Sequence, residues 1–128
     1  MKKRVFGLFV FWAIPAAAFD ASVSGTQVTV SYAEPTKDLD GSPLEDLLQT
    51  EVYYQVEGST VAVLGKGIAA SKPQGGGGVQ TNITIPVAQG EEKTVQVFGA
   101  ARDTSGNISQ ATSKVPVRID RMPPAPPQ

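Results

Sequence analysis

The sequence predicts an all-β protein, a sandwich of about seven antiparallel strands. Short segments alternate apolar and polar residues, which is the pattern of strands with one buried face. Turn-forming residues separate these segments at short intervals, and no segment beyond the apolar N-terminal stretch keeps a helical period. The 128 residues contain no Cys, so we expect one domain whose hydrophobic core is stable without disulfides.

The first 18 residues have the three parts of a secretory signal. Residues 2–4 are basic, residues 5–14 are apolar apart from Gly7, and alanines at 16–18 supply small side chains. The apolar run is shorter than the roughly 20 residues that a membrane-spanning helix needs. We therefore expect cleavage after Ala18, export to the periplasm or to outside the cell, and no membrane insertion afterwards. An uncleaved anchor or a buried N-terminal segment is the alternative.

The mature chain is expected to hold a β-sandwich at residues 19–120 and a Pro-rich tail or linker at 121–128. Residues 27–32 alternate cleanly and form the first clear strand. Residues 35–46 are acidic and turn-rich, which indicates a loop, and residues 44–48 allow one helical turn.

The second half of the sandwich supplies the other strands. Residues 50–56 alternate and are rich in β-branched and aromatic side chains, and residues 60–64 form a short strand. The glycines within residues 65–78 indicate a flexible loop or a ragged edge strand. Residues 103–107 form a compact turn. Further strands are expected at residues 79–87, 94–102 and 113–120, the last with Pro116 at a sheet edge.

Three segments resemble parts of bacterial fibronectin type III domains. Residues 28–35 (VTVSYAEP) look like the second strand of that family. Residues 40–47 (DGSPLEDL), followed by VYY at 52–54, look like a loop and strand common in its bacterial members. Residues 101–109 (ARDTSGNIS) look like the turn between the last two strands. The resemblance covers residues 21–120 and implies an immunoglobulin-like, fibronectin type III β-sandwich.

The sequence departs from that family at four positions. Tyr32 stands where the family usually has Trp, and Val95 stands where a Tyr usually fixes the preceding corner through its hydroxyl. Thr50 and Gly99 stand where an aromatic residue and a Val are common. We therefore expect a lighter core, because each buried Val-sized side chain that is lost costs about 1.5–3 kcal/mol.

Composition argues against several classes of function. The chain has no His and no Cys, so the usual general base and the thiol nucleophile are both absent, and we expect neither an enzyme nor a cofactor. Removal of residues 1–18 leaves eight basic against twelve acidic residues. This acidic balance argues against nucleic acid and against an anionic membrane surface as partners.

Two motifs have chemical interpretations that we consider weaker than structural ones. Four carboxylates in one loop, those of Asp38, Asp40, Glu45 and Asp46, are the ligand type of calcium, but their spacing does not fit the twelve-residue helix–loop–helix calcium loop. A solvated acidic loop without a metal is therefore expected. The glycines at 75–78 lack the Lys-Ser/Thr ending of a phosphate loop, so a flexible loop is expected there.

The placement of two aromatic side chains is the most informative feature. Strand alternation directs Tyr53 and Phe98 outward. The resemblance implies that their strands are neighbours in one sheet, so the two rings would form an exposed aromatic patch. Alternatively, residues 60–72 cover the patch. The candidate binding residues are Tyr53, Phe98, Arg102, Gln55 and Gln96.

Three functions agree with these observations. The first is a non-catalytic exported interaction or spacer module that presents a sandwich surface to a protein partner in the cell envelope or outside the cell. The second is a carbohydrate-binding module, which the absence of Trp from the mature chain disfavours. The third is a self-assembling envelope or filament subunit that forms oligomers through open strand edges.

Overall fold

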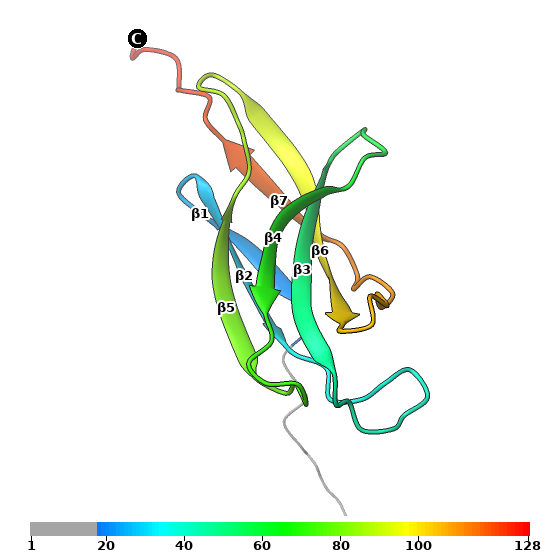
Figure 1. Cartoon of the computed structure of the whole chain (residues 1–128). Helices are drawn as coiled ribbons and strands as arrows, with labels where there is room; N and C mark the ends of the chain where they lie inside the picture. The colour runs from blue at the N-terminus through cyan, green and yellow to red at the C-terminus, as the bar shows by residue number, and fades with distance from the viewer. Residues whose placement is uncertain (1–17) are drawn as a thin grey trace, which may run out of the picture.

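The computed structural model describes residues 18–128 and shows only β-strands as regular secondary structure (Figure 1). The expected signal at residues 1–18 lies, apart from Ala18, outside the described residues. Residues 18–128 contain no helix with the length and hydrophobicity that crossing a membrane requires. The strands are β1 (Asp20–Ser24), β2 (Gln27–Ala33), β3 (Leu47–Val56), β4 (Val63–Ala69), β5 (Gly78–Thr84), β6 (Glu92–Asp103) and β7 (Val115–Asp120).

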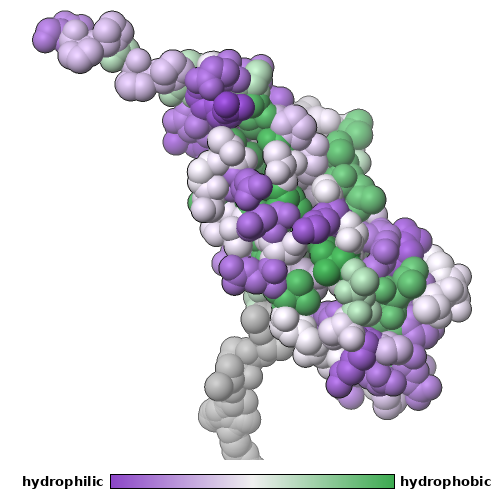
Figure 2. Space-filling model, turned by 60° about the vertical axis from the view of Figure 1, so that its left-hand side comes forward, coloured by the Kyte–Doolittle hydropathy of each residue, from purple (hydrophilic) through white to green (hydrophobic). Residues whose placement is uncertain are grey.

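The strands form two antiparallel sheets that pack as a β-sandwich. The three-stranded sheet has the order β1-β2-β5, and the four-stranded sheet has the order β4-β3-β6-β7. The predicted all-β sandwich of about seven antiparallel strands is therefore confirmed. Residues 121–128 contain no strand, and they leave one end of the sandwich (Figures 1 and 2).

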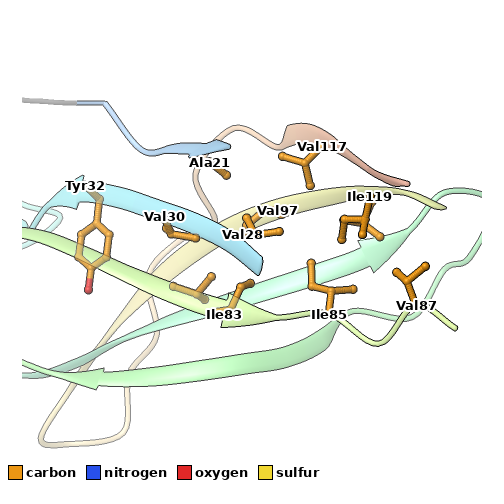
Figure 3. Packing of buried hydrophobic residues seen from close by; sticks show 12 residues of the cluster. Ala21, Val28, Val30, Tyr32, Ile83, Ile85, Val87, Val97, Val117 and Ile119 are labelled. Carbon is orange, nitrogen blue, oxygen red and sulfur yellow. The ribbon is translucent and has the colours of Figure 1, made fainter. Parts of the chain in front are cut away.

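Small β-branched side chains fill the space between the two sheets. Val28 and Val30 of β2 have no exposed surface, and Val97 and Ile119 of the opposite sheet are equally buried. Figure 3 shows these four side chains between the layers. Tyr32 lies on the same buried face of β2, so the alternation predicted for residues 27–32 is confirmed. Dense packing of this layer is the main source of stability in a chain without disulfides.

The structure corrects the expected helical turn at residues 44–48. β3 begins at Leu47, and the side chain of Leu47 is buried rather than displayed on a helix. The Leu47 N–H donates to the Pro73 carbonyl at 2.9 Å. A hydrogen bond to a distant segment therefore favours the extended conformation over a local helical turn.

The short strand expected at residues 60–64 is displaced toward the C-terminus. β4 covers Val63–Ala69, so residues 65–69 of the segment expected as a flexible loop or ragged edge strand belong to an edge strand. β4 pairs only with β3, and the register shifts between Val52 and Tyr53. An edge position with a bulge tolerates the glycines of β4, which is why composition alone placed the strand wrongly.

Phe19, which precedes β1, occupies core space that Gly99 leaves free. The Phe19 ring stacks on Tyr32 with centroids 6.2 Å apart and an interplanar angle of 20°. A Cβ atom at Gly99 would lie 2.8 Å from the Phe19 Cε1 atom. The lighter core expected at Gly99 is thus compensated in part by an aromatic side chain from before the first strand.

Gly99→Ala should destabilise the protein by about 1–3 kcal/mol, because the added methyl overpacks against Phe19. In a Phe19→Ala background the same substitution should cost nothing or stabilise slightly, because the space is then open and Ala suits a strand better than Gly. Urea unfolding of the four proteins in this double-mutant cycle measures the coupling. Equal costs of Gly99→Ala in both backgrounds would contradict the proposed packing.

Candidate functional site

The candidate site is the outer surface of the four-stranded sheet over β3 and β6. Tyr53 lies opposite Phe98 and Gln55 opposite Gln96 in the antiparallel register. Val52 points into the core, so the residues that alternate with it point outward. All five predicted site residues lie on this surface. We call it the β3–β6 face, and it comprises Glu51, Tyr53, Gln55, Gln96, Phe98 and Arg102.

The rings of Tyr53 and Phe98 stack, but they do not form the exposed aromatic pair that was predicted. Their centroids are 5.7 Å apart and their planes differ by 15°. Phe98 points outward as predicted, yet it is only 8% exposed. The Lys114 ammonium lies 5.4 Å from the Phe98 centroid, in cation–π geometry. The expected exposure of Phe98 is therefore wrong, because Tyr53 and Lys114 shield its ring.

The alternative, that residues 60–72 cover the patch, is also wrong. All of β4 lies within that segment, and β4 lies beside β3 in the same sheet instead of folding over its outer surface. Leu64 of β4 pairs with Tyr53 and is 53% exposed. An apolar row therefore crosses the sheet from Leu64 through Tyr53 to Phe98. Sequence reasoning missed Leu64 because the register between β3 and β4 depends on the bulge at Tyr53.

A buried carboxylate, that of Glu51, organises the β3–β6 face. Glu51 is 4% exposed although it points to the outside of the sheet. Arg102 binds it in bidentate fashion, with Nε donating at 2.7 Å and Nη2 at 3.2 Å. The Tyr53 hydroxyl donates to Glu51 at 2.5 Å, and Gln49 Nε2 donates at 2.6 Å. The carboxylate therefore fixes the positions of Arg102 and Tyr53 together.

These hydrogen bonds determine the protonation states on the face. The hydrogen bonds from Arg102 and Tyr53 lower the pKa of Glu51 to about 2. Donation to Glu51 raises the pKa of the Tyr53 phenol. Near neutral pH, Glu51 is thus charged and Tyr53 is a neutral donor. The face presents one ion pair whose protonation is the same across the physiological range.

Arg102 also connects the face to the turn at residues 103–107. Its Nη1 donates to the Gly106 carbonyl at 3.1 Å. Within the turn, the Asp103 carboxylate accepts hydrogen bonds from the backbone N–H groups of Ser105 and Asn107, both at 2.9 Å. The predicted compact turn is therefore confirmed, and its own hydrogen bonds hold it against the sheet.

Gln55 and Gln96 occupy the other end of the face. Gln55 Nε2 donates to the Ser59 carbonyl at 2.6 Å, and Lys114 Nζ donates to Gln55 Oε1 at 3.1 Å. Gln96 is half-buried and pairs with Pro116 of β7, which confirms the edge position expected for that proline. Lys114 thus connects Gln55 to the Phe98 ring, and the sequence alone gave no sign of this contact.

The acidic loop does not collect its carboxylates into a metal site. Within residues 18–128, no group of three or more acidic, His or Cys side chains is arranged to hold a metal ion. Asp40 accepts hydrogen bonds from the Ser42 hydroxyl and backbone N–H, at 2.6 and 2.9 Å. Burial and the nearby carboxylates of Asp103 and Asp38 raise the pKa of Asp46. Asp38, Asp40 and Glu45 are exposed.

A second buried carboxylate, that of Glu34, escaped sequence analysis. It is 4% exposed and accepts hydrogen bonds from the Ser71 N–H at 2.9 Å, the Ser71 hydroxyl at 2.5 Å and the Gly77 N–H at 2.9 Å. Burial by itself would raise the pKa of Glu34, but these hydrogen bonds outweigh it, and the pKa is lowered. Period-two alternation continues from Tyr32 to Glu34, so the buried position was readable from the sequence.

Close packing explains why glycine is needed at two of the positions within residues 75–78. Gly75 has a φ of +68°, and a Cβ there would lie 2.0 Å from the Pro35 carbonyl oxygen. A Cβ at Gly77 would lie 2.7 Å from the Ser71 hydroxyl and 2.9 Å from Glu34. Gly78 has open space around it and begins β5. The expected flexible loop is therefore a close-packed connection at Gly75 and Gly77, tied to Glu34.

Comparison of the chain with protein-family models, with curated proteins and with solved structures finds no match.

Glu51→Gln should weaken the dependence of stability on pH in acid solution. The pKa of Glu51 is about 2 in the folded protein and 4.5 without these contacts. Its contribution to the free energy of unfolding is therefore complete above the higher value and is lost as the pH falls toward the lower one. Urea unfolding at a series of acid pH values should show that the free energy of unfolding falls less with decreasing pH in Glu51→Gln than in the parent. Glu57→Gln, at an exposed carboxylate just beyond β3, is the control and should retain the loss. An undiminished loss in Glu51→Gln would refute the assigned role.

Gly75→Ala should destabilise the protein by about 2–4 kcal/mol, because it combines a left-handed backbone with a clash against a carbonyl oxygen. Gly78→Ala is the matched control in the same glycine run and should change the free energy of unfolding by less than about 1 kcal/mol. Thermal or urea unfolding measures both. Similar effects of the two substitutions would show that Gly75 is not close-packed.

Proposed function

We propose that this chain is a non-catalytic exported module of the fibronectin type III kind, which presents the β3–β6 face to a protein partner. The partner lies in the cell envelope or outside the cell. The signal-like residues 1–18 support export, and the acidic balance of the remaining chain favours a partner other than nucleic acid or an anionic membrane.

The arrangement of the strands supports the fibronectin type III proposal. Fibronectin type III domains share the architecture of two packed antiparallel sheets, and this chain has that architecture, with the orders β1-β2-β5 and β4-β3-β6-β7. The segments that resemble the family fall at corresponding places. Residues 28–35 include most of β2, residues 40–47 lead into β3, and residues 101–109 run from the end of β6 into the following turn.

The single observation that carries the functional proposal is the fixation of Tyr53 and Arg102 by Glu51. Tyr and Arg are enriched among the residues that contribute most to protein–protein binding. Their side chains usually lose conformational freedom on binding, which lowers affinity. Here Glu51 already holds both groups, and Leu64 extends the apolar surface beside them. The β3–β6 face therefore has the composition and the rigidity of a binding surface.

The same geometry gives less support to a carbohydrate-binding module. A platform for sugar rings needs broad, accessible aromatic faces. On the β3–β6 face, Tyr53 and Lys114 shield Phe98, which leaves Tyr53 as its only half-exposed ring.

A photoreactive amino acid placed at Leu64 should cross-link a discrete partner in intact cells of the protein's own host. Leu64 is the suitable position because it is exposed beside Tyr53 and takes no part in the Glu51 hydrogen bonds. The same amino acid at Gln80, which is exposed on β5 in the other sheet, is the matched control and should give no such adduct. The adduct at Leu64 should disappear with Tyr53→Ala. Equal adducts at both positions, or none at Leu64, would contradict the proposal.

Self-assembly is a second candidate, and the exposed edge at β4 favours it. β4 ends the four-stranded sheet, so one side of its backbone has no strand partner within the described chain. Val61, Val63 and Leu64 expose 62%, 40% and 53% of their surfaces at this edge and its hairpin. Figure 2 shows hydrophobic surface in several separate patches. Lys66 lies in the same edge strand, and edge lysines oppose strand pairing.

For the assembly candidate, sedimentation across a wide concentration range should reveal discrete oligomers. Val63→Lys should return them to monomers, because a charge at a sheet edge blocks pairing. Val23→Lys, at the β1 edge of the other sheet, is the control and should leave the oligomers intact. A monomer at every accessible concentration would exclude assembly and leave the first proposal as the explanation.

A further inference from the structure

Of the four edge strands in residues 18–128, β5 is the one whose own sequence does not oppose pairing with another strand. Edge strands are usually protected by charges, prolines, bulges or cover from another segment. β4 carries Lys66 and a bulge, and β7 carries Pro116 and Arg118. β1 is short, begins with Asp20 and lies near β7. β5 (GVQTNIT) has no charge and no proline, and its register with β2 is unbroken over its 7 residues.

One side of the β5 backbone is open. β5 pairs with β2 alone, and none of the backbone hydrogen bonds that loops make within residues 18–128 reaches residues 78–84. In an edge strand, every second residue directs its N–H and C=O groups away from the sheet, so this side can accept a further strand. β4 lies on the same side of the sandwich but belongs to the other sheet, and it does not pair with β5 (Figure 1).

The β5 sequence is also complementary to itself. An antiparallel pair of β5 strands from two copies, centred on Thr81, would keep all 7 residues of each strand paired. Val79 would lie opposite Ile83, Gln80 opposite Asn82, and Thr81 opposite Thr81. Pairs of β-branched side chains and pairs of threonines favour strand pairing. Because the two strands are related by a two-fold axis, the contact would close into a dimer.

One charge lies at this edge, and it comes from the other sheet. Lys66 of β4 pairs with Val52, which points into the core, so the Lys66 side chain points inward as well. Its ammonium reaches β5 and donates to the Thr81 hydroxyl at 2.7 Å. Lys66 is exposed, and no carboxylate within residues 18–128 forms an ion pair with it. A positive charge without a counter-ion on the chain therefore lies beside the centre of β5.

This charge opposes the pairing of two β5 strands. Residues directly opposite each other in an antiparallel pair have Cα atoms about 5 Å apart. Pairing around Thr81 would therefore bring the Lys66 ammonium groups of the two copies to neighbouring hydroxyls, where like charges repel. A shifted register would leave residues at the ends of β5 without partners.

We propose that β5 is a self-complementary edge which Lys66 keeps unpaired, and that two copies of the chain join through their β5 strands once this charge is removed. The assembly candidate uses β4, and the β3–β6 face belongs to the other sheet. The inference therefore depends on neither proposed function.

Sedimentation of Lys66→Gln and of the parent across a wide concentration range tests the inference. The substitution keeps an exposed polar side chain, so the fold should not change. We expect the dimerisation constant of Lys66→Gln to exceed that of the parent by at least about tenfold, because the repulsion between like charges a few ångströms apart is removed. Hydrogen exchange should then show added protection of alternate amides within residues 79–83 of the dimer.

Three variants separate this charge and this edge from other causes. Lys66→Arg keeps the charge and should behave as the parent. Lys37→Gln removes a positive charge from the exposed loop at residues 35–46, and it should also behave as the parent. Lys66→Gln combined with Asn82→Lys places a charge on β5 itself and should return the protein to monomers.

Four results would overturn the inference. The first is that Lys66→Gln associates no more than the parent. The second is that the β5 amides are already protected by pairing in the parent. The third is that the association survives Asn82→Lys or leaves the β5 amides unprotected, which would place the contact at another edge. The fourth is that Lys66→Arg or Lys37→Gln associates as much as Lys66→Gln, which would show that the charge of Lys66 is not the cause.

Discussion

The packing of every second side chain of β3 and β6 against the opposite sheet determines most of this structure. Val52 on β3 and Val95 and Val97 on β6 have no exposed surface, and they belong to the layer that stabilises a chain without Cys. A one-residue slip between these strands would turn this layer out to solvent, so the register is strongly fixed. The same register then places Glu51 near Arg102 and Tyr53 opposite Phe98 on the outer surface.

The outer surface acquires its order from this constraint. A buried carboxylate is costly unless hydrogen bonds and an opposite charge compensate it. Glu51 is compensated by Arg102, Tyr53 and Gln49, so these side chains are tied to one arrangement. Glu34 follows the same rule at the end of β2, where its partners fix the connection into β5. The two buried carboxylates thus organise a candidate binding surface and a close-packed loop.

Local pattern predicted the sandwich and most of its strands, because alternation and turn residues are properties of neighbouring positions. It also predicted the outward direction of Tyr53 and Phe98. It could not predict that Lys114 shields Phe98, since that contact depends on the path of the chain before β7. Ser71 and Gly77 lie 37 and 43 positions from Glu34, so their hydrogen bonds are equally invisible to local pattern. The Phe19 ring fills the space that a side chain at position 99 would occupy. This contact also joins residues far apart in the sequence, so local pattern could not predict it.

Glu51 holds Arg102 and Tyr53 in place before any partner binds. The ¹⁵N relaxation of the Arg102 Nε–H group tests this, with Arg118 for comparison because its side chain is 64% exposed and pairs only through Nη2 with the surface carboxylates of Glu92 and Asp120. We expect an order parameter for Arg102 close to the rigid value of about 0.85, and a value for Arg118 nearer the flexible range below about 0.6. An Arg102 side chain as mobile as that of Arg118 would contradict the claim that this surface is preformed.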